Sequence, residues 1–325
     1  MAKRNLVEAI NSGLMLEMEK DPAMVVMGED VGKEGGVFRV TDGLQARFGP
    51  ERVIDTPLAE SGIIGTALGM AVKGLHPVAE IQFEGFLAPA MDQIMSHISR
   101  IRTRSRGRFT CPMVIRSPWG GGIRAPEHHS DSPEAIFAHT PGIKVVIPSS
   151  PYDAKGLIIS AIRDPDPVLF FEPKRIYRAI REEVPDESYT VPIGEAKVVR
   201  EGKDITIISW GAMVREVLRA VETADKEGIQ AEVIDLRTIS PLDEKSFLDS
   251  VRKTGRAVIV HEAPPTCGLG AEIIARINEE ALLSLQAPVV RVTGFDTVVP
   301  LMKLENYYLP NPERILAGIR KVMSF

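Results

Sequence analysis

Cysteine is scarce in this chain. Only Cys111 and Cys267 occur among the 325 residues, far apart in the sequence and in no CxxC pattern. Neither a framework of disulfides nor a zinc site built on paired cysteines is therefore indicated. A reducing compartment fits this usage.

Long apolar runs and a surplus of positive charge are also missing. No stretch approaches the ~18 apolar residues of a membrane-spanning helix, and the first twenty residues lack the apolar core of a signal peptide. The formal net charge is −5, so nucleic-acid binding would need a concentrated basic patch. One arginine run has no interleaved aromatics and fits a solvated helix end or a subunit contact better: Arg100, Arg102, Arg104, Arg106 and Arg108. We expect a cytoplasmic protein that binds neither nucleic acid nor membranes.

Apolar runs alternate with helical stretches along the first half of the chain. Apolar residues recur at helical spacing between residues 5 and 20, which predicts a first helix. Short apolar runs then follow at 24–27, 52–54, 78–83, 113–116, 144–147 and 168–171. This alternation predicts an α/β fold whose largely parallel sheet is covered on both faces.

A second, smaller α/β domain is predicted after residues 175–203, where the alternation is lost. Its expected strands are 205–210, 231–236, 257–260 and 289–292. Ser240, followed by Pro241 and Asp243, predicts the capped start of a helix that Gly255 ends. We place the domain boundary between residues 185 and 186, giving domains 1–185 and 186–325.

Polar segments follow four strands of the first predicted sheet. Ligands of open parallel sheets bind beyond the carboxyl ends of the strands. We therefore expect the segments at 28–30, 55–60, 82–86 and 119–132 to face one crevice.

The segment DTPLAESGIIGTALGMA, residues 55–71, is the most informative of these. Taken alone, it is explained by Glu60 complementing the positive end of a helix and by glycines that serve packing. The segment also matches the DTPxxE signature of the β subunits of thiamine-diphosphate-dependent 2-oxo acid dehydrogenases, the E1 components. Similarity to that family extends through SSPYDAKGLIISAIRD, DITIISWGAMVREVL and VIDLRTISPLD to the carboxyl terminus. The resemblance implies a thiamine-diphosphate pyrimidine-binding domain followed by a smaller domain like the transketolase C-terminal domain.

The same resemblance implies roles for individual residues. Glu60 would bind the aminopyrimidine of thiamine diphosphate, and the glycine helix would pack at a subunit interface. A carboxyl group sheltered from water has the raised proton affinity that this position needs. The residues that would surround the cofactor rings are Glu29, Leu58, Gln82 and Phe86. Ordinary packing at strand ends explains Leu58 and Phe86 equally well.

A second polar segment, GGGIRAPEHHSDSPE, begins at Gly120. Its glycines suit close approach to a phosphate or a substrate. His128 and His129 are adjacent and make a poor metal pair, and a loop histidine is often only a structural hydrogen-bonder. The resemblance singles out His129, which Ser130 and Asp131 follow, as the residue that contacts the intermediate and assists reductive acylation of the lipoyl group.

The segment IRDPDP, residues 162–167, resembles a family loop that binds a monovalent cation, usually potassium, largely through main-chain oxygens. A plain turn is the competing interpretation. The ligands implied by position are Met113, Ala161, Ile162, Asp164 and Asp166.

Half of the implied cofactor site is missing from the chain. No GDG followed by an asparagine pair, the pattern that holds Mg²⁺ and the diphosphate, occurs. In the family the α subunit supplies this half in an α2β2 tetramer, and the E2 lipoyl acyltransferase is the next partner, docking on the second domain. The implied activity is oxidative decarboxylation of pyruvate with reductive acetylation of the E2 lipoyl group.

Three alternatives remain open. A branched-chain 2-oxo acid dehydrogenase E1 β subunit and an acetoin dehydrogenase β subunit share the fold and Glu60. An electron-transfer-flavoprotein-like nucleotide-binding subunit, from a different class, would need a glycine-rich phosphate turn after a strand, and no GxGxxG occurs there.

Overall fold

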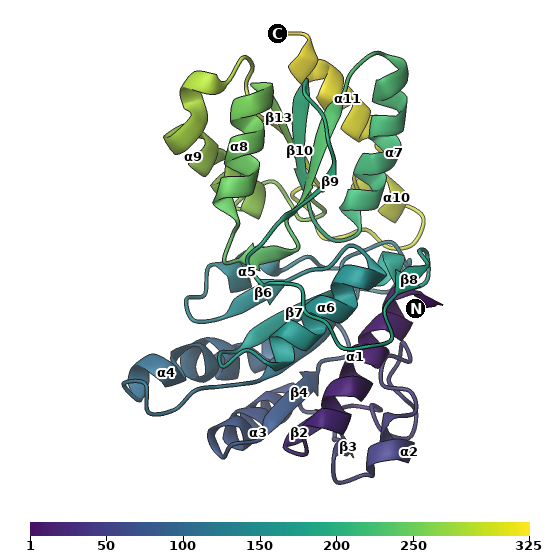
Figure 1. The fold of residues 1–325 in the computed structure, drawn as a ribbon, viewed down its shortest axis with the longest axis vertical. Coiled ribbons are helices and arrows are strands. Elements are labelled where there is room, and N and C mark those ends of the chain that lie inside the picture. The colour runs from purple at the N-terminus through teal and green to yellow at the C-terminus, as the bar shows by residue number, and fades with distance from the viewer.

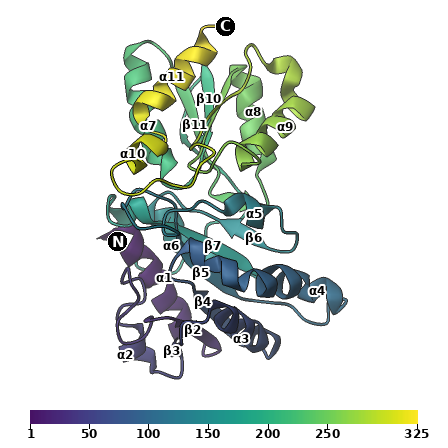
Figure 2. The same ribbon diagram turned by 180° about the vertical axis from the view of Figure 1, so that it is seen from behind.

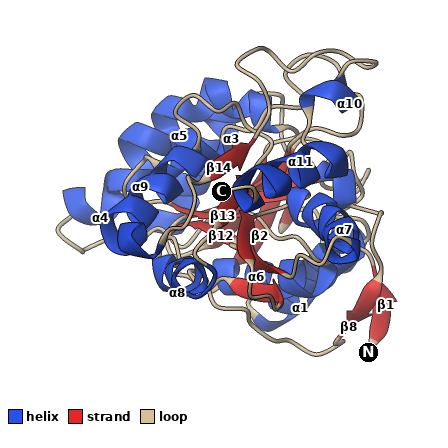
Figure 3. Cartoon of the chain, turned by 90° about the horizontal axis from the view of Figure 1, so that it is seen from above, coloured by secondary structure: helices blue, strands red, loops and turns tan.

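The computed structural model describes all 325 residues and contains two α/β domains stacked one above the other (Figure 1). The first domain is built on a seven-stranded sheet and the second on a five-stranded sheet. A separate antiparallel ribbon pairs β1 (Ala2–Arg4) with β8 (Glu182–Val184) at the periphery beside the N-terminus (Figure 3). The predicted fold class is confirmed.

The first sheet has the order β12-β6-β7-β5-β4-β2-β3, and all its pairings are parallel except that of β12 with β6. Its strands are β2 (Met24–Gly28), β3 (Val53–Asp55), β4 (His76–Glu80), β5 (Val114–Trp119), β6 (Lys144–Val146), β7 (Val168–Pro173) and β12 (Thr238–Ser240). Strands β2, β5 and β7 are buried throughout. Burial on both faces explains why these strands appear in the sequence as continuous apolar runs.

Helices cover both faces of this sheet, as Figures 1 and 2 show from opposite sides. They are α1 (Leu6–Lys20), α2 (Leu44–Phe48), α3 (Glu60–Val72), α4 (Ile101–Arg104), α5 (Glu134–Ala138) and α6 (Pro151–Ile162). Short 3₁₀ turns occupy Glu84–Ala90, Ile98–Arg100 and Lys174–Ile176, and a π turn occupies Gln93–His97. The predicted first helix is confirmed, and Asn5 and Glu8 form a reciprocal capping box at its start.

Helices α1 and α6 pack side by side against one face of the sheet. The apolar residues predicted to share one face of α1 are all buried. A side-chain carbon at Gly13 would lie 2.7 Å from Ile158 Cγ2, so only glycine allows this close approach of the two helices. Each fully buried Leu or Ile contributes roughly 1.5–3 kcal/mol relative to exposure.

The second domain has the sheet order β14-β13-β10-β11-β9, in which only the pairing of β9 with β11 is antiparallel. Its strands are β9 (Lys197–Arg200), β10 (Ile205–Ser209), β11 (Ala231–Asp235), β13 (Ala257–Val260) and β14 (Val290–Val292). Its helices are α7 (Met213–Lys226), α8 (Glu244–Thr254), α9 (Leu269–Ala281), α10 (Glu305–Tyr308) and α11 (Pro312–Met323), with a 3₁₀ turn at Leu282–Ser284. The four strands predicted here are confirmed, with shifts of a residue at some ends.

The predicted cap of α8 is wrong by three residues. Ser240 is the last residue of β12, and Asp243 caps α8 by accepting a hydrogen bond of 3.1 Å from the Ser246 N–H. Both residues can cap, but the pairing of β12 with β6 keeps Ser240 in an extended strand. The predicted stop at Gly255 is confirmed, since this residue ends α8 in the left-handed conformation.

Strand β12 lies in the sequence of the second domain yet completes the sheet of the first. Next to it, Arg237 donates a hydrogen bond of 3.0 Å to Asp153 of α6, and both side chains are buried. The Ile147 N–H also donates to the Arg237 carbonyl at 2.8 Å. The two domains are therefore joined by a strand pairing and a buried ion pair in addition to the connecting chain.

Candidate active site

The carboxyl ends of β2, β3 and β4 meet at one edge of the first sheet. The Thr56 N–H donates to the Gly28 carbonyl at 2.9 Å, which joins the segments that follow β3 and β2. The Gln82 side-chain amide donates to Asp30 at 3.1 Å, which joins the segments after β4 and β2. Hydrogen bonds therefore join three of the four polar segments expected to face one crevice, and the fourth, residues 119–132, meets the 82–86 segment through ring contacts.

Glu60 opens helix α3 at this edge. Its carboxyl group is in the first turn, and the residue is 9% exposed. The nearby hydrogen bonds of Gln82 and Asp55 do not use the Glu60 carboxylate. The hydroxyl of Thr56 is buried without a partner, whereas Leu58 is 77% exposed. This surface offers a free carboxyl and an apolar side chain to a ligand, and the unpartnered hydroxyl of Thr56 lies buried in the same segment.

Glu29 lies close enough to Glu60 for the charge of Glu60 to affect the pKa of Glu29. Partial burial raises the pKa of Glu29, and the negative charge of Glu60 raises this pKa further. The raised pKa of Glu29 thus reports both its partial burial and the closeness of the Glu60 carboxylate.

The glycines of α3 present an open surface. A side-chain carbon at Gly69 would meet nothing within 4 Å, and one at Gly62 would meet only Ala59, at 3.6 Å. Gly62 and Gly69 therefore do not serve packing within the chain, whereas a side-chain carbon at Gly65 would lie 3.5 Å from Gln93. The prediction that this helix packs at a subunit interface stays a prediction.

A buried charge network underlies the edge. Arg116 of β5 donates to Glu80 of β4 and to Glu172 of β7, each at 2.7 Å, and the Tyr177 hydroxyl donates to Glu172 at 2.7 Å. All four side chains are buried, and the two carboxylates raise the pKa of the Arg116 guanidinium further above its usual range. Sequence reasoning missed this network, although a charged residue inside each of three apolar strands was a usable signal.

His129 lies in an aromatic surrounding. Its ring centroid is 4.2 Å from that of Phe83 and 5.1 Å from that of Phe86. Its Nδ1 is 2.7 Å from the Glu127 carbonyl oxygen, an arrangement in which Nδ1 carries the proton and Nε2 is left as an acceptor. His128 is exposed and takes a left-handed backbone conformation. The His129 ring therefore packs against the rings of Phe83 and Phe86, whereas the His128 ring packs against neither.

A buried ion pair lies next to these aromatics. Lys174 Nζ is 2.5 Å from Glu84, both side chains are fully buried, and the ammonium group lies 5.3 Å from the Phe83 ring centroid. Burial raises the pKa of Glu84 to about 8, while burial lowers the pKa of Lys174. Neither residue was singled out in the sequence.

The glycines after β5 do not face a ligand, contrary to the expectation. The N–H groups of Gly121 and Gly122 donate at 2.9 and 2.8 Å to Glu262 and Glu305, which both belong to the second domain. Sequence reasoning missed both acids, because 141 and 183 residues separate them from the glycines that donate to them.

The predicted cation loop is occupied by internal contacts. Lys144 Nζ lies 2.7 and 2.5 Å from the two carboxylate oxygens of Asp164, and Arg102 Nε lies 2.5 Å from Asp166. The Met113 carbonyl accepts from the Val168 N–H, and the Ala161 carbonyl accepts at the end of α6. No group of three or more His, Cys, Asp or Glu side chains is arranged to hold a metal. A cation held largely by main-chain oxygens, Ile162 included, stays a prediction.

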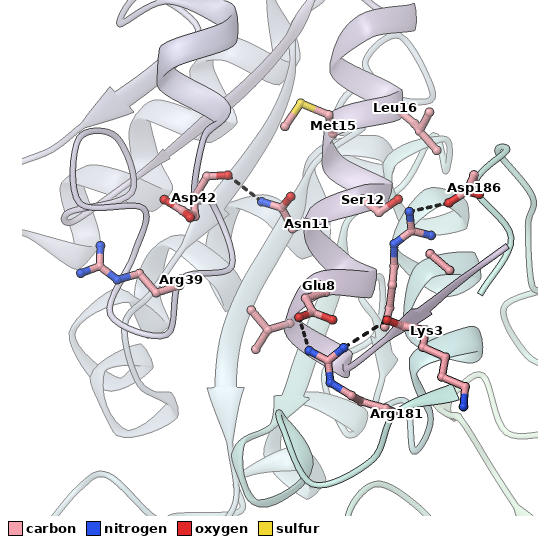
Figure 4. A pocket seen from close by; sticks show the side chains of 13 residues that line it. Lys3, Glu8, Asn11, Ser12, Met15, Leu16, Arg39, Asp42, Arg181 and Asp186 are labelled. Atoms are coloured by element: carbon pink, nitrogen blue, oxygen red, sulfur yellow. Dashed lines mark hydrogen bonds and ion pairs between the residues drawn. The ribbon is translucent and has the colours of Figure 1, made fainter. Parts of the chain in front are cut away.

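A well-formed hollow of the molecule lies elsewhere. It has a volume of about 640 Å³ and lies beside α1, where Figure 4 shows Asn11, Arg39, Asp42 and Arg181. Arg181 there pairs with Glu8 and donates to the Lys3 carbonyl. None of the predicted site residues lines this hollow, so it has no part in the candidate site.

None of the helices is long and apolar enough to span a lipid bilayer. Residues 2–179 match the pyrimidine-binding domain of transketolase, and residues 194–315 match the transketolase C-terminal domain. These matches favour the thiamine-diphosphate fold over the flavoprotein alternative.

Relatives similar over the full chain have one description in common. The pyruvate dehydrogenase E1 component subunit β of Acholeplasma laidlawii is 57% identical over 322 residues, covering 99% of this chain and 98% of the relative. The protein of the same description from Bacillus subtilis (strain 168) is 54% identical over 325 residues, covering all of both chains. A solved structure, a split-gene transketolase in an inactive β4 tetramer, superposes with a TM-score of 0.81 at 25% identity and covers 99% of both chains. The chain therefore belongs to the family of pyruvate dehydrogenase E1 component β subunits.

Proposed function

We propose that this chain is one half of a thiamine-diphosphate site that decarboxylates pyruvate oxidatively and transfers the acetyl group to the lipoyl group of an E2 acyltransferase. The observation that carries the proposal is the edge of the first sheet. There a sheltered Glu60, with Glu29 beside it and a free Thr56 hydroxyl, lies on a surface that includes the exposed Leu58. The relatives' description as pyruvate dehydrogenase subunits favours pyruvate over branched-chain 2-oxo acids and acetoin.

The residues at this edge fit the aminopyrimidine half of the cofactor. When bound, thiamine diphosphate supplies the carbon nucleophile and electron sink for decarboxylation. Glu60 would bind the aminopyrimidine, with Glu29, Leu58, Gln82 and Phe86 around the rings. The unpartnered Thr56 hydroxyl adds a hydrogen-bonding group that the chain itself does not use.

The chain lacks the matching half of such a site. It has no GDG motif for Mg²⁺ and the diphosphate, and no cluster of acids that could hold a metal. We propose that an E1 α subunit provides this half in an α2β2 tetramer, with the open glycine face of α3 at the subunit contact. Potassium at the 162–167 loop and a cytoplasmic location remain predictions of the same kind.

Glu60 would act by holding a proton. Its carboxyl group would share that proton with a ring nitrogen of the aminopyrimidine. Beside it, partial burial and the charge of Glu60 raise the pKa of Glu29. A glutamine could accept a hydrogen bond there but could not share the proton.

His129 would act later, when the lipoyl disulfide opens. A departing sulfur needs a proton, and a protonated imidazole ring can deliver one. The contacts of His129 with Phe83 and Phe86 shield part of its ring and leave Nε2 as the atom that would exchange the proton.

The test is Glu60→Gln in the complex assembled with the α subunit. Decarboxylation, measured with an artificial electron acceptor, should fall by ~10²–10⁴-fold, the usual loss when a general acid or base is removed. Glu51→Gln, at an exposed acid outside the site, is the matched control and should leave the rate unchanged. Near-normal turnover of Glu60→Gln would remove Glu60 from the mechanism.

A further inference from the structure

The loop that carries His129 is held by the second domain. It runs from Gly120 to Ser132, between β5 and α5. Within it, the Gly120 N–H donates to the Asp131 carbonyl at 3.2 Å, which closes the base of the loop. The neighbouring N–H groups turn away from their own domain and donate to carboxylates of the other.

Glu305 makes the largest share of these contacts. Its Oε1 accepts from the Gly122 N–H at 2.8 Å and its Oε2 from the Arg124 N–H at 2.9 Å. The Ser130 hydroxyl lies 3.5 Å from Oε1. Glu305 therefore contacts the loop on both sides of His129, before it at Gly122 and Arg124 and after it at Ser130.

The backbone of the loop is shaped to receive a negative charge. Gly120, Gly122 and Arg124 have φ values of +80°, +100° and +57°. Left-handed residues that alternate with ordinary ones aim successive N–H groups into one concavity, which binds anions. Here two carboxylates of the second domain accept these N–H groups, Glu262 from Gly121 and Glu305 from Gly122 and Arg124.

Glu305 is committed to this contact. Its side chain is buried, and it makes no salt bridge with a Lys, Arg or His side chain. Glu262 supports it by accepting from the Gly121 N–H at 2.9 Å. A side-chain carbon at Gly120 would lie 2.8 Å from a Glu262 oxygen, so glycine is needed where the two domains meet.

We propose that Glu305 is a positioning residue: it holds the loop so that His129 stays against Phe83 and Phe86, in place for the lipoyl step. The inference rests on the proposed role of His129 in that step. The hydrogen bonds of Glu305 go to the loop, at two N–H groups and at Ser130, so it acts through His129.

The experiment uses Glu305→Gln in the complex assembled with the α subunit. The amide keeps the size of the side chain but accepts fewer N–H groups and carries no charge. Hydrogen exchange of the peptide 120–132, followed by mass spectrometry, should become faster by about tenfold, the factor expected for losing one hydrogen bond to a charged group. Glu313→Gln, at an exposed acid of α11, should leave this exchange unchanged.

Kinetics separate positioning from a general loss of structure. Lipoyl acylation by Glu305→Gln should fall about tenfold, while decarboxylation with an artificial acceptor and the KM for pyruvate stay near the parent values. The double variant Glu305→Gln with His129→Ala should lose no more acylation than His129→Ala alone, because the two residues act as one unit. Restoring the charge with Glu305→Asp should recover part of the rate.

Two results would overturn the inference: unchanged exchange in the peptide 120–132, or losses in the double variant that simply multiply. Failure of the proposed function would appear elsewhere, as normal decarboxylation by Glu60→Gln. The two failures are therefore distinguishable.

Discussion

Replacing Glu134 with glutamine tests the electrostatics of the buried region behind the His129 loop. Glu134 opens α5 and is fully buried. One carboxylate oxygen accepts from Trp119 Nε1 at 3.2 Å, and the other has no partner. Burial raises the pKa of Glu134 to about 8, and repulsion from Glu262 adds to the rise. The group therefore stays protonated in the folded chain at neutral pH.

A raised carboxyl pKa makes the folded state less stable as the pH rises. Below pH ~4.5 both folded and unfolded chains are protonated at Glu134, and there is no cost. Between pH ~4.5 and the folded pKa of about 8, only the folded state keeps the proton, so the free energy of unfolding falls by about 1.4 kcal/mol per pH unit. Over a window of roughly 3.5 units the loss reaches about 5 kcal/mol at most, and it stays constant above pH 8.

Glu134→Gln removes this dependence, because the amide is neutral at every pH and its oxygen can keep the bond to Trp119. The melting temperature of the variant relative to the parent, followed by circular dichroism, should therefore rise between pH 5.5 and pH 8.5. Other buried acids with raised pKa values, Glu84 and Asp235 among them, are present in both proteins and cancel in the comparison. Glu222→Gln, at an exposed position, is the control. A difference between variant and parent that is the same at both pH values would refute the reasoning.

Three further outcomes are expected. His129→Ala should lower the rate of lipoyl acylation by ~10²–10⁴-fold and lower the rate of decarboxylation with an artificial acceptor much less. His128→Ala is the neighbour control. Equal losses in both steps would mean that His129 organises the whole site. The isolated chain should bind thiamine diphosphate weakly by calorimetry even with Mg²⁺ present, since it lacks the diphosphate half-site, and tight magnesium-dependent binding would contradict this. Arg116→Met should reduce the unfolding free energy by about 3–5 kcal/mol in urea denaturation, because it leaves Glu80 and Glu172 buried without their cation. Arg108→Met, at an exposed arginine, should change the unfolding free energy little. Equal stability of the two variants would show that the two buried carboxylates need no cation.

The sequence alone determined the elements and the order in which they follow each other. Apolar periodicity reports the surroundings of one short segment, so it predicted α1 and most strands of both sheets, but not β9 or β12. Helix caps and stops are equally local, as the Asn5 capping box and Gly255 show. The rule that ligands bind beyond the carboxyl ends of parallel strands then placed Glu29, Glu60 and Gln82 at one edge.

The roles expected of single residues needed more than local pattern. Taken alone, Glu60 was better explained as the acid that complements a helix end, and only the match of the DTPxxE segment and the full chain to a family gave it a chemical role. Its sheltered place beside Glu29 could not be predicted by periodicity, because the repulsion between the two depends on where β2 and α3 lie in space.

Only the tertiary structure determined the contacts between segments that are far apart in the sequence. The pairing of β12 with β6 drew Ser240 into a strand and moved the cap of α8 to Asp243. The local backbone conformation fixes the direction of the N–H groups of the glycines after β5. It does not fix which anion accepts from them. The packing of the second domain against the first placed Glu262 and Glu305 at those N–H groups, and so set the position of the loop that carries His129.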